Sequence, residues 1–122
     1  MGYSNPDLYH QPEAFGLRTI GEVEWDDDSY SFNITAVWQC KGDPKLFYWG
    51  SDAGCSCPAP FEGFTSLEGD AFAEVNKGTK HEVIKALLDE LERVKKVNDS
   101  YSWRTFDPSD DVLELVGKLV RL

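Results

Sequence analysis

Apolar and polar residues alternate with a period of two along residues 30–40, which is the clearest pattern in the chain. Such alternation predicts a β-strand with one buried face. The side chains on the apolar side are Tyr30, Phe32, Ile34, Ala36, Trp38 and Cys40. The opposite side is polar except for Val37. We therefore expect this strand to bury the face that carries Trp38 and to expose the other.

Two further strands are expected on either side of this one. Residues 17–25 place Leu17 and Trp25 on the same face if the alternation is unbroken, and residues 45–52 are apolar on both faces. An Asp/Ser cluster separates the first two strands, and residues 41–44 form the second turn. Short turns between successive strands favour an antiparallel meander over residues 17–52, with three strands or more.

Helical periodicity replaces strand periodicity in the last third of the chain. Apolar residues recur at helical spacing over residues 79–97 and again over residues 108–121. Thr79 followed by Glu82 predicts a capping box at the start of the first helix. Asp107 followed by a proline predicts an N-cap, with the proline at the first position of the second helix. We expect both helices to pack on the apolar face of the sheet.

The remaining segments complete a single domain over residues 1–122. Residues 1–15 read as an irregular N-terminal arm, and residues 53–78 as a loop region rich in cysteine, proline and glycine. Four apolar side chains in that loop region predict packing on the body of the domain, namely Phe61, Phe64, Leu67 and Phe72. Residues 66–75 are compatible with a short helix or a strand. The fold class is α+β, an antiparallel sheet followed by two helices.

Charge is distributed unevenly along the 122 residues. The net charge is −10, of which residues 1–78 carry −9 and residues 79–122 carry −1. A strongly acidic surface repels phosphate backbones, so direct nucleic-acid binding is not expected. It suits a basic protein partner, although solubility alone also accounts for it. No apolar run is long enough for a membrane span and no signal peptide is evident, so we expect a cytoplasmic protein without a membrane partner.

Two of the three cysteines, Cys55 and Cys57, lie one residue apart in a loop that follows an aromatic strand. Structural zinc sites space their cysteines more widely and need four ligands. Redox pairs prefer two intervening residues at a helix start, which Pro58 and Pro60 disfavour. A structural role for the pair is therefore favoured, while a metal or thiol site built on it remains an alternative. No cofactor is expected.

No catalytic set is evident in the sequence, because it holds only two histidines and lacks nucleotide-binding glycine motifs. Asp52 is expected to satisfy backbone N–H groups of the loop that follows it. Trp25 and Trp49, near strand ends, are natural anchors for a partner if they are exposed. The candidate partner-binding residues are Trp25, Trp49, Asp52, Cys55, Cys57 and Phe61.

Residues 13–17, 21–25, 48–52 and 54–62 together resemble small uncharacterised proteins of actinobacterial phages and their hosts. The Cys-Ser-Cys-Pro run at residues 55–58 is the most specific part of this likeness. The family is a domain of unknown function, so the resemblance implies no catalytic residues. It implies a phage accessory protein expressed in a bacterial cytoplasm.

These observations favour a binding protein over an enzyme. The expected function is to bind, and thereby inhibit, a host or defence protein through the acidic sheet edge and the Trp49–Phe61 loop. One alternative is the metal- or thiol-dependent site on Cys55 and Cys57. A further alternative is a module that holds a small ligand between the loop and the helices. The sequence leaves the oligomeric state open.

Overall fold

A computed structural model of the chain describes residues 6–26, 31–55, 60–101 and 106–122. The sheet consists of β1 (Leu17–Glu24), β2 (Ser31–Cys40), β3 (Phe47–Cys55) and β4 (Asn76–Gly78). The strands lie in chain order and every neighbouring pair is antiparallel. The expected meander is confirmed, and β4 adds a short fourth strand from the end of the loop region.

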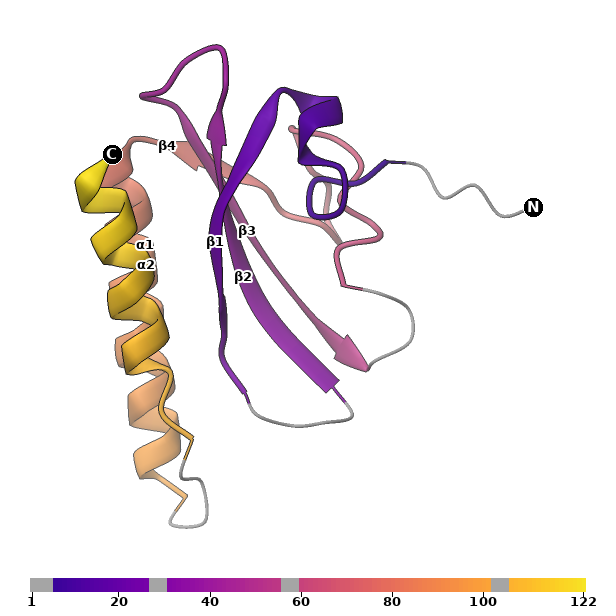
Figure 1. Cartoon of the computed structure of the whole chain (residues 1–122). Helices are drawn as coiled ribbons and strands as arrows, with labels where there is room; N and C mark the ends of the chain where they lie inside the picture. Colours follow the sequence, from indigo (N-terminus) through magenta and orange to yellow (C-terminus); the bar gives the residue numbers. More distant parts are fainter. Residues whose placement is uncertain (1–5, 27–30, 56–59, 102–105) are drawn as a thin grey trace.

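Helices α1 (Lys80–Asp99) and α2 (Ser109–Arg121) follow the sheet and pack on one of its faces (Figure 1). The capping box of α1 is present: the Glu82 N–H donates to Thr79 Oγ1 at 3.3 Å, and the Thr79 N–H donates to Glu82 Oε1 at 3.1 Å. The expected N-cap of α2 is displaced by one residue. Pro108 is the N-cap, and Asp107 Oδ1 accepts the N–H of Ser109, the first residue of the helix, at 2.9 Å. Among the described residues, no helix is both long and apolar enough to span a bilayer.

The sheet is buried on both faces, which corrects the expectation of one buried face. Val37 and Phe47 join the helices in one core cluster, whereas Ile34 and Trp38 belong to a second cluster. The helices thus cover the face that the polar residues of β2 were expected to expose. Burial of those residues is possible because their polar groups are paired: Thr35 Oγ1 accepts the Trp25 indole N–H at 2.8 Å.

A bulge in β1 changes which residues share a face. The pairing with β2 shifts between Thr19 and Gly21, so one extra residue lies in β1 at this point. Leu17 therefore packs in the cluster away from the helices, while Trp25 packs in the cluster beneath them. The expectation that Leu17 and Trp25 share a face was wrong, because an extra residue reverses the alternation beyond it.

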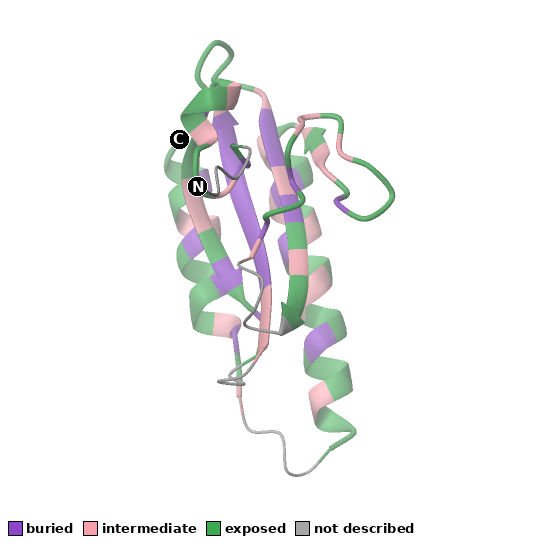
Figure 2. Cartoon of the chain, turned by 90° about the vertical axis from the view of Figure 1, so that its right-hand side faces the viewer, coloured by how far each residue is buried: buried purple, intermediate pink, exposed green. Residues whose placement is uncertain are grey.

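The face opposite the helices is covered by two segments without regular strands, residues 6–16 and 60–75, which we call the loop layer (Figure 2). The N-terminal arm, expected to be irregular, contains the short 3₁₀ helix η1 (Pro12–Phe15). Leu8 is completely buried, and its N–H donates to the Phe64 carbonyl at 2.9 Å. This bond joins the two segments of the loop layer, so the domain has three layers: helices, sheet and loop layer.

Candidate functional site

Phe61 lies at the centre of an aromatic cluster under the loop layer. Its ring stacks on Tyr9, with centroids 4.8 Å apart and planes 9° from parallel, and meets Phe64 edge-on at 4.8 Å. Trp38 from β2 approaches at 6.0 Å, nearly perpendicular. Phe61 is completely buried, so it supports the layer from inside and does not form part of the molecular surface. The proposal that Phe61 contacts a partner is corrected accordingly.

Asp52, in β3, fixes the point where the chain enters this cluster. Its Oδ2 accepts the Phe61 N–H at 2.7 Å, and its Oδ1 accepts the Ala53 N–H at 3.0 Å. The expected role in satisfying loop backbone N–H groups is confirmed. Phe61 has a φ of 66°, a conformation that is uncommon for residues other than glycine. The carboxylate therefore helps to hold Phe61 in a backbone conformation it would otherwise seldom adopt.

The other candidate residues lie apart from one another. Trp25 is only 5% exposed and packs beneath the helices, so it presents no anchor to a partner. Trp49 is half-buried against the same cluster. Cys55 ends β3, but its side chain and all of Cys57 lie outside what the structure describes. Within the described residues, no group of three or more histidine, cysteine, aspartate or glutamate side chains is placed to hold a metal.

Phe72 is the large hydrophobic side chain that the structure leaves most open to solvent, at 97% exposed among those described. It belongs to a tight turn over residues 69–73, which we call the Phe72 turn. Asp70 Oδ1 accepts the N–H groups of Phe72 at 2.8 Å and Ala73 at 2.9 Å, and the Asp70 N–H donates to the Ala73 carbonyl at 3.0 Å. Ala73 is buried in the core of the loop layer. The turn is therefore fixed at its base while Phe72 projects from it.

The Phe72 turn was not found from the sequence, where Phe72 was expected to pack on the body. The available signal was the aspartate that opens the turn, since aspartate side chains commonly bond the backbone two residues on. Ala73 is buried in the position that Phe72 was expected to occupy. The turn directs the larger side chain of Phe72 outward into solvent. Local sequence alone does not determine which of two adjacent apolar residues faces inward.

Carboxylates surround the Phe72 turn. Glu68, Asp70 and Glu74 are exposed, and residues 46–76 contain no lysine, arginine or histidine. None of these three carboxylates forms an ion pair with a described cation. Burial raises the pKa of the Tyr48 phenol, and the neighbouring Cys40 and Glu68 side chains raise it further. The surface around the turn therefore carries three exposed carboxylates that are not ion-paired with a described cation.

The acidic character extends to the N-terminal part of the loop layer. The Tyr9 hydroxyl donates to Glu22 Oε1 at 2.7 Å. Burial raises the pKa of Tyr9 well above its ordinary value, and the hydrogen bond to Glu22 and the charges of Glu22 and Glu24 act in the same direction. Negative side chains from β1 and from residues 60–75 thus border the same layer.

The geometry defines a small α+β domain whose loop layer presents an exposed aromatic residue within an acidic surface. The chain belongs to a family described only as a domain of unknown function, DUF7574, whose model matches residues 6–121. No curated protein and no solved structure matches the chain.

Proposed function

We propose that this protein acts by binding another protein, with Phe72 as the anchor residue and the surrounding carboxylates as its rim. The observation that carries the proposal is the 97% exposure of Phe72 on a turn whose base is hydrogen-bonded and buried. Aromatic anchors in the middle of an interface contribute a large share of binding free energy. A preformed turn loses little conformational entropy on binding, which favours this site over a free loop.

The partner surface that fits this site is an apolar pocket rimmed by lysine or arginine. Burying a phenylalanine side chain fully contributes about 2–3 kcal/mol. Glu68, Asp70 and Glu74 would lie around that pocket, and their unpaired charges would accelerate encounter with a basic surface. Such binding weakens as salt concentration rises, because the charges on both surfaces are exposed until contact.

The resemblance to small phage proteins supports a host or defence protein as the partner. Occupation of a basic surface on that protein would inhibit it without catalysis, which agrees with an acidic domain of this size. Of the residues first expected to contact a partner, Trp49 and Asp52 lie on β3. Phe61 and Trp25 are buried inside the domain. The proposed contact surface is therefore centred on the Phe72 turn rather than on the loop between Asp52 and Phe61.

The loop layer and the helices lie on opposite faces of the sheet, so a small ligand held between them would have to displace the sheet. Nothing in the described residues favours that alternative. The thiol or metal alternative depends on Cys57, which lies outside the described residues.

The test is affinity purification from cells that express the protein, with mass spectrometry of the proteins that co-elute. A partner that is lost with Phe72→Ala and retained with Leu113→Ala would support the proposal, since Leu113 is also exposed but lies on α2. Purified partner should then bind more weakly to a Glu68→Lys/Glu74→Lys variant, and this loss should shrink as salt is raised. A partner that is retained in full by Phe72→Ala would refute the assignment of this surface.

A further inference from the structure

Three cationic side chains line one open hollow between the start of β1 and the end of α2. Arg18 comes from β1, and Lys118 and Arg121 come from the last turn of α2. The hollow has a volume of about 340 Å³. None of the three cations forms an ion pair with a described residue. The helix dipole favours cations in the last turn of α2, but it does not account for Arg18, which belongs to a strand.

A second hollow adjoins the first, and we call the two together the basic end. The second hollow has a volume of about 390 Å³, and its lining includes Lys45, Lys80 and His81. Leu122 lines both hollows, so they meet at the end of α2. Lys45 and Lys80 form no ion pair with a described residue either. Figure 1 shows that the turn between β2 and β3, the start of α1 and the end of α2 lie at the same end of the domain.

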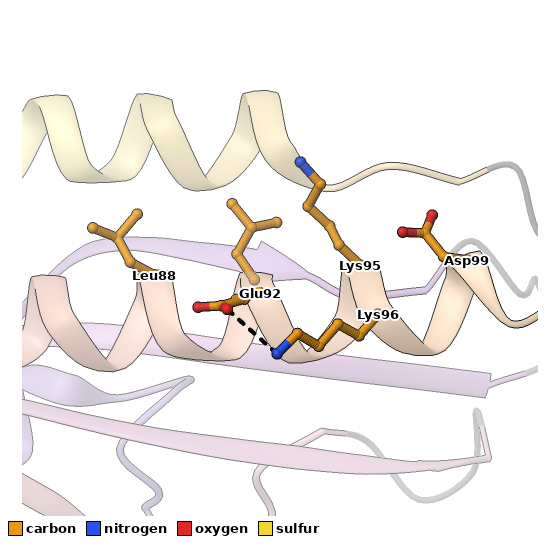
Figure 3. Close-up of a pocket in the computed structure, with 6 residues that line it drawn as sticks. Leu88, Glu92, Lys95, Lys96 and Asp99 are labelled. Atoms are coloured by element: carbon orange, nitrogen blue, oxygen red, sulfur yellow. Dashed lines mark ion pairs between the residues drawn. The ribbon is translucent and has the colours of Figure 1, made fainter.

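The composition of this lining is unusual for a chain with 22 acidic residues and 12 lysines and arginines. Among the described residues, no aspartate or glutamate lines either hollow of the basic end. The groove along α1 has the ordinary mixture, since Glu92 and Asp99 line it together with Lys95 and Lys96. Figure 3 shows Lys96 paired with Glu92 in that groove. The cations of the basic end are therefore grouped without the carboxylates that accompany cations on α1.

A buried glutamine holds Arg18 in place. Gln39 is only 6% exposed, its Oε1 accepts the Arg18 Nε–H at 2.8 Å, and its Nε2 donates to the Pro44 carbonyl at 2.9 Å. Pro44 lines the second hollow, so one buried amide connects the walls of both hollows. The bond to Gln39 uses only Nε, which leaves the two terminal nitrogens of the guanidinium available to a ligand. A guanidinium fixed in this way is suited to bind two oxygens of one oxyanion.

We propose that the basic end binds a small phosphorylated molecule, whose phosphoryl group is held by Arg18, Lys118 and Arg121. A phosphoryl group carries a charge of about −1.5 to −2 and three acceptor oxygens. Three cations around one hollow match this charge better than they match a single carboxylate. Lys45 and Lys80, in the adjoining hollow, attract further anionic groups of the same molecule.

The ligand is small because acidic residues begin next to the basic end. Lys118 also lines another hollow, which Glu22, Asp111 and Glu114 line as well. A nucleic acid or an anionic membrane would extend over these carboxylates and be repelled by them. A small ligand stays within the hollow, where screening over about 8 Å at physiological salt weakens the field of more distant carboxylates.

Isothermal titration calorimetry with inorganic pyrophosphate, at constant ionic strength, tests the site. Arg121→Gln should raise the dissociation constant at least about tenfold, because charge-assisted hydrogen bonds to the phosphoryl oxygens are lost. Arg18→Lys keeps the charge but removes the planar fork, and should raise the dissociation constant about fivefold. Circular dichroism of Arg121→Gln should be unchanged, because Arg121 is exposed and has no described partner. In NMR spectra of the wild-type protein, pyrophosphate should shift the amide signals of residues 18–20 and 118–122.

Lys95→Gln is the matched control. It removes the same charge from the groove along α1 and should change the dissociation constant less than about twofold, because that lysine lies outside both hollows. Phe72→Ala should also bind pyrophosphate like the wild type, so this site succeeds or fails independently of the proposed protein binding. Triglutamate, which carries its charge on carboxylates, should bind at least about tenfold more weakly than pyrophosphate.

Three results would overturn the proposal. The first is a wild-type dissociation constant for pyrophosphate weaker than about 10 mM. The second is an equal loss of affinity in Lys95→Gln and Arg121→Gln, which would show that only the overall charge of the protein matters. The third is equal affinity for triglutamate and pyrophosphate, which would exclude selection of a phosphoryl group.

Discussion

The hydrogen bonds of Asp52 lead to a quantitative prediction about stability. In Asp52→Ala the Phe61 N–H loses its acceptor at a residue that is completely buried. Leaving a buried donor unsatisfied costs about 1–3 kcal/mol. The second bond, to the exposed Ala53 N–H, adds about 0.5 kcal/mol. We therefore expect Asp52→Ala to lower the free energy of unfolding by about 1.5–3.5 kcal/mol.

Urea unfolding followed by tryptophan fluorescence measures this change. The slope of the free energy of unfolding against urea concentration should be unchanged, while the midpoint concentration of urea falls. This combination indicates a loss of stability without a change in the surface exposed on unfolding. In a thermal melt the same loss should lower the melting temperature by about 6–12 °C for a domain of this size. Asp52→Asn keeps one carbonyl oxygen as an acceptor and should lose about half as much free energy.

Asp43→Ala provides the matched control. Asp43 Oδ1 accepts the Lys45 N–H at 3.2 Å in an exposed turn, so its removal should cost no more than about 0.5 kcal/mol. If Asp52→Ala were no less stable than Asp43→Ala, the reasoning about the buried Phe61 N–H would be refuted. If Asp52→Ala kept full stability and lost partner binding, Asp52 would be a contact residue rather than a structural one.

Two further predictions concern the loop layer. Gly69→Ala should destabilise the domain by at least about 2 kcal/mol, because Gly69 has a φ of 67° and a Cβ there would lie 2.5 Å from the Ala73 carbonyl oxygen. Gly42→Ala, with open space around it, should be neutral in the same thermal melt. Because the pKa of Tyr9 is raised on folding, its contribution to stability is fully present below its ordinary pKa of 10.0 and is lost as pH rises through the higher folded value. Absorbance titration should show late ionisation of both Tyr9 and Tyr48, and Tyr9→Phe should remove one of these two phenols; an unchanged titration curve would contradict this.

Most of the secondary structure follows from local sequence patterns. The meander, both helices and the Thr79 capping box depend on alternation, helical spacing and capping chemistry, all of which act within a few residues. Which face of the sheet each side chain occupies does not follow from local sequence patterns. The extra residue in β1 between Thr19 and Gly21 reverses every later side chain of that strand, and the single glycine beside it, Gly21, is a local sign of a bulge but does not by itself establish one. Burial of Thr35 depends on Trp25, a partner ten residues away.

The candidate site was less predictable than the fold, because it depends on which aromatic residue the tertiary structure buries. Phe61 and Phe72 lie in the same loop region and have the same side chain. Phe61 is enclosed by Tyr9, which the N-terminal arm supplies, and by Trp38 from β2. Phe72 is held outward by a turn whose inward position is taken by Ala73. These are long-range packing outcomes that local periodicity does not encode.

The bond between Asp52 and Phe61 also has a mechanical consequence. Asp52 directly precedes residues 53–60 and Phe61 directly follows them. The bond therefore holds the two flanking residues together, with 2.7 Å between Asp52 Oδ2 and the Phe61 nitrogen. Length changes in a loop with fixed ends cost little free energy, because the closure entropy grows only slowly with loop length. A peptide tag inserted between Cys55 and Phe61 should therefore cost the domain little stability, because the Asp52–Phe61 bond still holds the two sides of the insertion together.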